Sequence, residues 1–168
     1  MKKLLIIMVI ALALSACTFS TDNTKQPALE SRIESMQNQV KELTPGLGEI
    51  MGVIQQHHAK LYYSADAGNW ELAKYQLGEI EEGLDAAAKL YPQFKDVKTR
   101  LDVLVPTMTK DDIESLFKAI EKKNRKDFML SYGKLTNSCN ACHNAANRGF
   151  IVIQTPTTSE FSNQKFEP

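Results

Sequence analysis

The sequence predicts an all-α protein, an antiparallel four-helix bundle with an extra N-terminal helix and an extended C-terminal tail. Three observations predict this class. Apolar residues recur every three or four positions over long stretches, short polar turns separate these stretches, and no segment alternates apolar and polar residues as a half-buried strand does. With 168 residues, 43% of them hydrophobic, the chain is long enough for one well-formed core and too short for two full domains.

The first residues are typical of an export signal. Two lysines precede an apolar run over residues 4–14, and small residues then lead to Cys17. About eleven apolar residues are too few to cross a bilayer as a stable helix. The stretch Leu14-Ser15-Ala16-Cys17 resembles the end of a bacterial lipoprotein signal, which implies that residues 1–16 are removed and that Cys17 carries lipid. An ordinary signal peptide, in which Cys17 has no such role, is the alternative.

The same resemblance implies a location. Thr18 follows Cys17, and in lipoproteins of this kind a residue other than aspartate there implies transfer to the outer membrane of a Gram-negative cell. We therefore expect an exported protein that is anchored to the membrane through its N-terminal lipid and faces the periplasm. Residues 17–28 are polar and aperiodic, which predicts a tether between the lipid and the folded body.

Two helices are expected next. The N-terminal helix is predicted over residues 29–43, where apolar residues step by four and three. A second helix is predicted to begin at Thr44-Pro45, as an N-cap followed by proline at the first helical position, and to end before Gly68-Asn69. The apolar positions of these two helices are Leu29, Ile33, Met36, Val40 and Leu43, and then Leu47, Ile50, Met51, Ile54, Leu61 and Ala65.

The following helix has the most regular apolar stripe of the chain. It is predicted to start at Asn69 or Trp70 and to stop at Tyr91-Pro92. Its stripe consists of Trp70, Ala73, Leu77, Ile80, Leu84, Ala87 and Tyr91. Acidic residues lie near the opposite side, which predicts a solvated face rather than a site.

The rest of the bundle is predicted in two parts. Residues 92–109 look irregular because they contain prolines, and we expect them to pack across one end of the domain. Thr109 is then predicted to cap a short helix, and residues 124–126 to form a turn. The last helix is expected to run to about Asn147, followed by a tail over residues 149–168 whose apolar residues pack back on the bundle.

The most specific motif of the chain is Cys139-Asn140-Ala141-Cys142-His143. Two thiols three residues apart, with a histidine directly after the second, have the spacing for c-type haem attachment. On a helix these three side chains fall on one face, because they occupy positions i, i+3 and i+4. Two thioether links to one porphyrin and an imidazole ligand to its iron are therefore predicted, with one covalent haem per chain.

A thioredoxin-like redox pair and a zinc site are the other uses that this spacing of cysteines allows. A thioredoxin-like redox pair needs its first thiol at a helix N-terminus, whereas Cys139 follows about three turns of helical pattern. A zinc site needs further ligands, which His57 or His58 would have to supply. With Cys17 carrying lipid and Cys139 and Cys142 carrying haem, no thiol is left over in an oxidising compartment.

The arrangement resembles the cytochrome c′ and cytochrome c-556 family of four-helix-bundle monohaem cytochromes. The resemblance covers about residues 44–148, and its best-matched stretch runs from Leu135 to His143. It implies that Cys139 and Cys142 form the thioethers and that His143 is the proximal iron ligand. Arg148 is the nearest counterpart of a basic residue that the family has after its haem histidine, although Ala146 replaces the usual aromatic residue between them.

The distal side of the iron is where the chain departs from the family. The family's first helix supplies either an apolar residue that blocks the sixth position or a methionine that ligates it, whereas this chain also offers histidines. His58 is the expected distal ligand, with Met51, His57 and an empty or blocked position as alternatives. Helical phase does not decide between the histidines, since both fall at edges of the apolar stripe.

These features predict a lipid-anchored monohaem c-type cytochrome that carries single electrons and is not an enzyme. The alternatives are a five-coordinate haem protein that binds gases such as NO or CO, and a zinc-stabilised lipoprotein without a redox role. The chain contains 20 acidic and 20 basic residues, and this balance gives no reason to expect nucleic-acid binding. A redox partner protein is implied but not identified, and a homodimer is left open.

Overall fold

The computed structural model describes residues 25–95 and 97–168, and over this part the chain is all-helical, with no strand. It divides into two compact units, Met1–Thr44 and Pro45–Pro168. The predicted signal peptide, Cys17 and the first part of the predicted tether lie outside the described residues. None of the described helices combines the length and the apolar character needed to cross a membrane.

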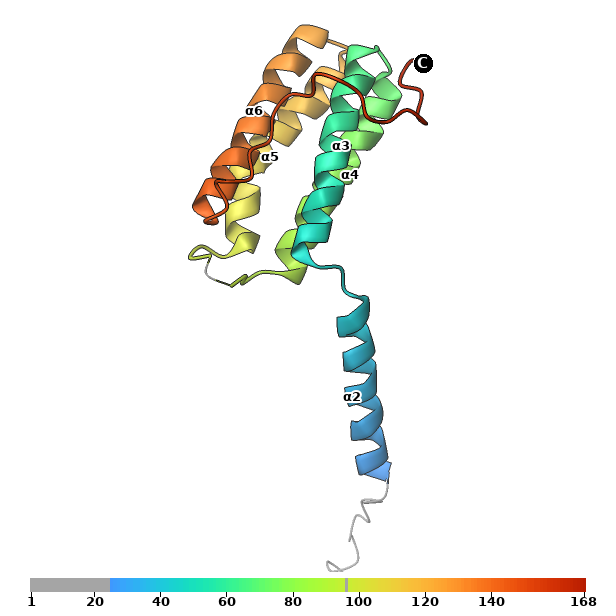
Figure 1. Ribbon diagram of the computed structural model, residues 1–168, viewed down its shortest axis with the longest axis vertical. Coiled ribbons are helices and arrows are strands. Elements are labelled where there is room, and N and C mark those ends of the chain that lie inside the picture. Colours follow the sequence, from blue (N-terminus) through green and yellow to red (C-terminus); the bar gives the residue numbers. More distant parts are fainter. Residues whose placement is uncertain (1–24, 96) are drawn as a thin grey trace, which may run out of the picture. The chain divides into compact units, whose positions relative to one another are not determined.

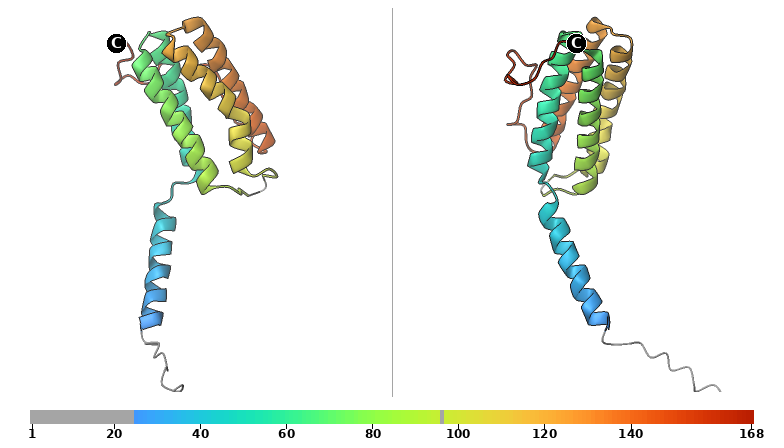
Figure 2. Two further views of the ribbon diagram at one scale, coloured as in Figure 1. Left: turned by 180° about the vertical axis from the view of Figure 1, so that it is seen from behind. Right: turned by 90° about the vertical axis from the view of Figure 1, so that its right-hand side faces the viewer.

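The first unit contributes helix α2, Lys25–Leu43. The second unit contains α3 (Leu47–Asp66), α4 (Trp70–Leu90), α5 (Leu101–Glu121) and α6 (Arg125–Ala145). Within this unit each helix packs against the next along the chain, and α3 also contacts α6 (Figures 1 and 2).

Hydrogen bonds between the helix ends fix how α3 lies against its neighbours. The Tyr91 hydroxyl, at the end of α4, donates to the carbonyl of Pro45 just before α3, at 2.8 Å. At the opposite end of α3, the Arg125 guanidinium of α6 pairs with the Asp66 carboxylate. The start of α3 therefore lies beside the end of α4, and the end of α3 lies beside the start of α6.

One hydrophobic core lies between α3, α4, α5 and α6. Its most enclosed side chains come from all four helices, and they are Leu61, Ala65, Ala73, Leu77, Ile80, Ala87, Leu116, Phe128, Tyr132 and Leu135. At one end the core is aromatic, because the Phe128 ring stacks on Tyr132 and meets the edge of Trp70. The apolar stripes predicted for α3 and α4 supply most of their buried positions.

The helix boundaries around α4 and before α6 follow the sequence signals. Asn69 is the N-cap of α4 and accepts a hydrogen bond from the backbone N–H of Leu72. Asn124 caps α6 in the same way, and Gly68 adopts a positive φ of 77° after the end of α3. The predicted stop at Tyr91 is also confirmed, because Tyr91 is the C-cap of α4.

The predicted start of α3 is wrong by two residues. The helix begins at Leu47, and its N-cap is Gly46 rather than Thr44. The Thr44 hydroxyl instead donates to the carbonyl of Val40 at 2.7 Å, so it bonds back to the preceding helix. A threonine before a proline can bond in either direction, and the sequence pattern does not distinguish the two.

The irregular connection predicted over residues 92–109 is confirmed only as far as Arg100, and the short helix capped by Thr109 is wrong. A single helix, α5, begins at Leu101 and contains Pro106 in its second turn. Thr109 lies inside this helix, where its buried hydroxyl donates to the carbonyl of Val105 at 2.9 Å.

Core packing explains why Pro106 does not prevent this helix. A proline inside a helix loses one backbone hydrogen bond and costs about 3 kcal/mol. Leu101, Leu104 and Val105 are all buried, and full burial of a Leu or Val side chain contributes about 1.5–3 kcal/mol each. Their combined burial outweighs the cost of the proline, which local sequence signals do not reveal.

Gly83 marks a close approach of α4 to α3. A Cβ atom at this position would lie 2.6 Å from Cγ1 of Ile54, which is a buried residue of α3. Gly78, on the same helix, has open space around the position of a Cβ atom. The two glycines therefore provide a matched pair for testing this contact.

We expect Gly83→Ala and Gly78→Ala to change stability in opposite directions. Gly78→Ala should raise the free energy of unfolding by about 0.5–1 kcal/mol, because alanine is the better helix former. Gly83→Ala should lower it, because the overpacking against Ile54 costs about 1–3 kcal/mol. Chemical denaturation followed by circular dichroism measures both. Equal stabilisation by the two substitutions would contradict the close approach of α3 and α4.

Candidate functional site

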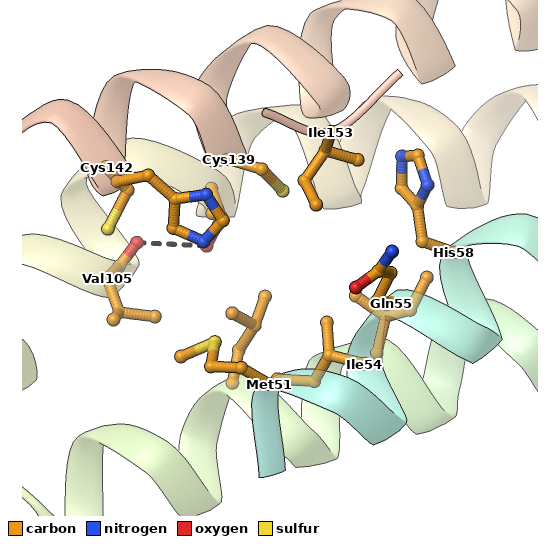
Figure 3. A pocket seen from close by; sticks show the side chains of 12 residues that line it. Met51, Ile54, Gln55, His58, Val105, Cys139, Cys142 and Ile153 are labelled. Atoms are coloured by element: carbon orange, nitrogen blue, oxygen red, sulfur yellow. Dashed lines mark hydrogen bonds between the residues drawn. The ribbon is translucent and has the colours of Figure 1, made fainter. Parts of the chain in front are cut away.

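A cavity between α3 and α6 brings together residues that are far apart in the sequence. Its volume is about 60 Å³, and Figure 3 shows the side chains around it. Met51, Ile54 and His58 come from α3, while Cys139, Cys142 and His143 come from the last turns of α6. The remaining lining residues are Gln55, Ile80, Leu84, Val105, Thr109 and Ile153. The three side chains of the predicted haem motif therefore line one mainly apolar space.

A second cavity, of about 410 Å³, shares part of this lining. Met51, Cys142, His143 and Ile153 line both cavities, so the two spaces adjoin at these residues. The second cavity extends towards the start of α3 and of α5, where Leu47 and Leu101 line it. Its volume falls in the range of about 300–1,000 Å³ that is usual for ligand sites, and its lining is also mainly apolar.

The two thiols of the motif are not joined to each other. Cys139 and Cys142 are both free, partly buried and packed against the hydrophobic core. Burial raises the pKa of the Cys139 thiol to about 12 and also raises the pKa of Cys142. Both groups are therefore neutral thiols near pH 7, unlike the exposed, low-pKa thiolate of a dithiol oxidoreductase.

The ring of His143 is oriented by the chain that follows α6. Its Nδ1 lies 2.9 Å from the carbonyl oxygen of Ile151, which is a hydrogen-bond acceptor only. Nδ1 must therefore carry the proton, and Nε2 is left with a lone pair. This is the usual arrangement of a metal-binding histidine, whose second ring nitrogen donates to a carbonyl or carboxylate.

His58 lies at the other end of the cavity and is buried. Its Nε2 is 2.9 Å from the Thr136 hydroxyl, and its Nδ1 is 2.9 Å from the Tyr132 hydroxyl. Both partners belong to α6, and the Tyr132 ring also packs on the imidazole with 4.5 Å between ring centroids. Both ring nitrogens are thus engaged, and burial lowers the pKa of His58 to about 4.

The other two candidate ligands are placed differently. His57 does not line either cavity, because its ring turns towards α4, where Nδ1 lies 2.7 Å from the side-chain oxygen of the buried Gln76. Met51 is partly buried and lines both cavities. Figure 3 shows its thioether among the same group of side chains as Cys142. The structure therefore brings Met51 and His58, but not His57, to the space beside the motif.

Sequence reasoning missed three kinds of lining residue. Val105 and Thr109 reach the cavity only because α5 is longer than predicted. Gln55 precedes the two histidines without any apolar signal of its own. Ile153 comes from the tail, and a run of three β-branched residues ending there was the one signal of a buried or packed segment.

The residues present fit a covalently bound haem in their chemistry. Two thiols and one imidazole with a free Nε2 project from one face of α6 beside an apolar space. For a zinc site the same three residues would need a further ligand. Over residues 25–95 and 97–168, no three or more His, Cys, Asp or Glu side chains are grouped so that they could hold a metal ion.

The buried His58 predicts that the polypeptide without haem is destabilised by acid. In the folded protein His58 stays neutral until the pH falls to about 4. In the unfolded chain it binds a proton below about pH 6.5. The unfolded state then binds more protons, so stability should fall as the pH is lowered from 6.5 to 4, by at most about 3 kcal/mol. Denaturation of the Cys139→Ala/Cys142→Ala variant at several pH values, with and without His58→Gln, measures this. An identical pH dependence in both would contradict it.

Comparison with known proteins finds no relative of this chain. No protein-family model matches it, and neither a curated protein nor a solved structure matches it significantly.

Proposed function

We propose that this protein is a monohaem c-type cytochrome that transfers single electrons. One observation carries the proposal, namely that Cys139, Cys142 and His143 line one apolar cavity, with the Nε2 lone pair of His143 left available by the bond from Nδ1 to Ile151. The spacing of the three residues has few other uses, and a low-pKa redox pair does not fit thiols whose pKa is raised by burial.

The roles of the chain's own residues follow from this. Cys139 and Cys142 would hold the haem through two thioethers, each formed by addition of an S–H bond across a vinyl group without an oxidant. His143 would bind the iron through Nε2, and the apolar walls formed by Ile54, Ile80 and Leu84 would exclude water. Bound haem supplies an iron that takes up and releases one electron. In the described part of the chain we assign no residue to catalysis.

The fold proposed around this site is an antiparallel four-helix bundle formed by α3, α4, α5 and α6. The contacts of Tyr91 with Pro45 and of Arg125 with Asp66 support opposite directions for α3 and α4 and for α3 and α6. The short connections between α3 and α4 and between α5 and α6 support the same arrangement. We propose α2 as an additional N-terminal helix that is not one of these four.

We also propose that the protein is exported, attached to the membrane by lipid on Cys17, and exposed to the periplasm, with the outer membrane as its site. The support for this is the sequence Leu14-Ser15-Ala16-Cys17 after a charged and apolar start. Haem attachment to Cys-x-x-Cys-His takes place outside the cytoplasm, so the two assignments are consistent with each other. The partner implied is a redox protein.

For the distal side of the iron, the contacts favour Met51 over His58. The thioether of Met51 lines both cavities, whereas His58 would have to give up a hydrogen bond to Thr136 or Tyr132 before it could bind a metal. Breaking a bond of a buried polar group costs about 1–3 kcal/mol. Met51 and His143 together would give a low-spin iron that suits electron transfer.

A five-coordinate haem protein that binds NO or CO is the second candidate. A third cavity, of about 740 Å³, opens between α3 and the tail and is lined by Gln55, Gln56, Tyr63 and Thr158. His58 lines this cavity as well as the one beside the motif, so a small molecule has a route to the same region. If neither Met51 nor His58 binds the iron, this route favours gas binding.

The attachment of haem can be tested by removing thiols. Produced in cells that mature c-type cytochromes, the protein should absorb strongly in the visible range, and its mass should include one covalent haem. The Cys139→Ala/Cys142→Ala variant should lose the covalent adduct. Cys17→Ser, which also removes a thiol, should keep the adduct and move the protein from the membrane to the soluble fraction. A colourless wild-type protein with no haem in its mass would refute the function.

The distal ligand can be tested with two matched alanine variants. We expect the wild-type spectrum to be low-spin and unchanged by CO. Met51→Ala should convert it to a high-spin spectrum that CO alters, because a sixth position opens. His58→Ala should stay low-spin. The reverse result would assign His58 as the ligand, and CO binding by the wild-type protein would favour the five-coordinate alternative.

A further inference from the structure

The segment after α6 turns back and runs alongside α6 and α3 rather than leading away from the helices (Figure 1). Its first part is clamped by Asn140, which lies in the motif between the two cysteines. The side-chain oxygen of Asn140 accepts from the backbone N–H of Ile153 at 2.7 Å, and its amide donates to the carbonyl of the same residue at 2.9 Å. One asparagine thus bonds both backbone groups of one residue, as a strand partner would.

Two residues before this clamp, the chain bonds to the proximal histidine. The carbonyl of Ile151 accepts from Nδ1 of His143 at 2.9 Å. The acceptor is a backbone atom of the segment itself. His143 therefore loses this hydrogen bond if the segment moves away from α6. The clamp at Ile153 therefore holds the acceptor for His143 in place, and the Ile153 side chain lines the cavity beside the motif.

The far end of the segment is attached to α3. The Tyr63 hydroxyl donates to the carbonyl of Thr158, and the Phe166 ring packs against Tyr63 with 5.4 Å between centroids. The amine of Lys60 lies over the Phe161 ring at 4.9 Å. Phe166 is buried in the folded unit, with 9% of its surface exposed. The segment therefore spans from α6 to α3 and is held at both ends.

We propose that residues 149–168 form a strap that is part of the haem site, and that Asn140 is the positioning residue that keeps the Ile151 carbonyl on His143. This inference rests on the proposed function, because it assigns a role towards the iron ligand. A hydrogen bond from Nδ1 fixes the ring and makes Nε2 a stronger donor. A stronger donor stabilises the ferric iron, so the strap lowers the reduction potential.

The test compares the same substitution at two asparagines of α6. Asn140→Leu keeps the volume of the side chain and removes both bonds to Ile153. Asn137→Leu is the matched control, since Asn137 is exposed on the same helix one turn earlier. Both proteins are made as full-length, haem-bearing chains, and the haem adduct is verified by mass before any other measurement.

Two readouts are followed, the midpoint potential and the rate at which trypsin cleaves at Arg148, directly before the strap begins. Asn140→Leu should shift the potential upwards so that the ferrous-to-ferric ratio at a fixed applied potential rises about tenfold, which corresponds to about 59 mV for one electron. Its cleavage at Arg148 should also be faster than in the wild type. Asn137→Leu should match the wild type in both readouts.

Faster cleavage without a change of potential would overturn the positioning role, and an unchanged cleavage rate would overturn the clamp itself. If Asn140→Leu does not accumulate as a folded, haem-bearing protein, the midpoint potential and the cleavage rate are measured on Asn140→Ala instead, with the same expected results. Absence of haem from the wild-type mass would instead refute the proposed function, so the two failures are distinguishable.

Discussion

The arrangement of this site depends on how α3 meets α6. The two helices touch closely at one end, where His58 bonds to Tyr132 and Thr136 and where Arg125 pairs with Asp66. Their contacts are sparser than those of the other neighbouring helices. Beyond the His58 cluster the helices leave room for the cavities beside Cys142 and His143. A polar cluster thus closes one end of the interface, and apolar space remains at the other.

This arrangement also explains why a histidine is buried without a charged partner. Burial disfavours the protonated ring, and two hydroxyl groups satisfy both ring nitrogens in the neutral form. Every buried side-chain nitrogen or oxygen in the described part of the chain has a hydrogen-bond partner. A satisfied polar cluster of this kind specifies one alignment of α3 on α6, whereas apolar contacts alone would accept several.

Periodicity predicted the helices well where no proline intervenes. The stripe from Trp70 to Tyr91 predicted both the start and the end of α4 correctly. The Cys-x-x-Cys-His spacing predicted that its three side chains share one face of α6. Periodicity failed at α5, because the cost of Pro106 is local whereas the burial that outweighs it comes from other helices. The sequence also could not predict which of His57 and His58 faces the cavity. Their hydrogen-bond partners Gln76, Tyr132 and Thr136 are distant in the sequence.

The burial of the two thiols restricts the order of events in biogenesis. Cys139 and Cys142 pack against the core and are neutral near pH 7, so in the folded chain they are poorly placed to react. A chain that closes around its own cysteines first would be trapped in an inert form. Under the proposed function, thioether formation would have to precede the docking of the end of α6. The attachment machinery would then act on the unfolded chain.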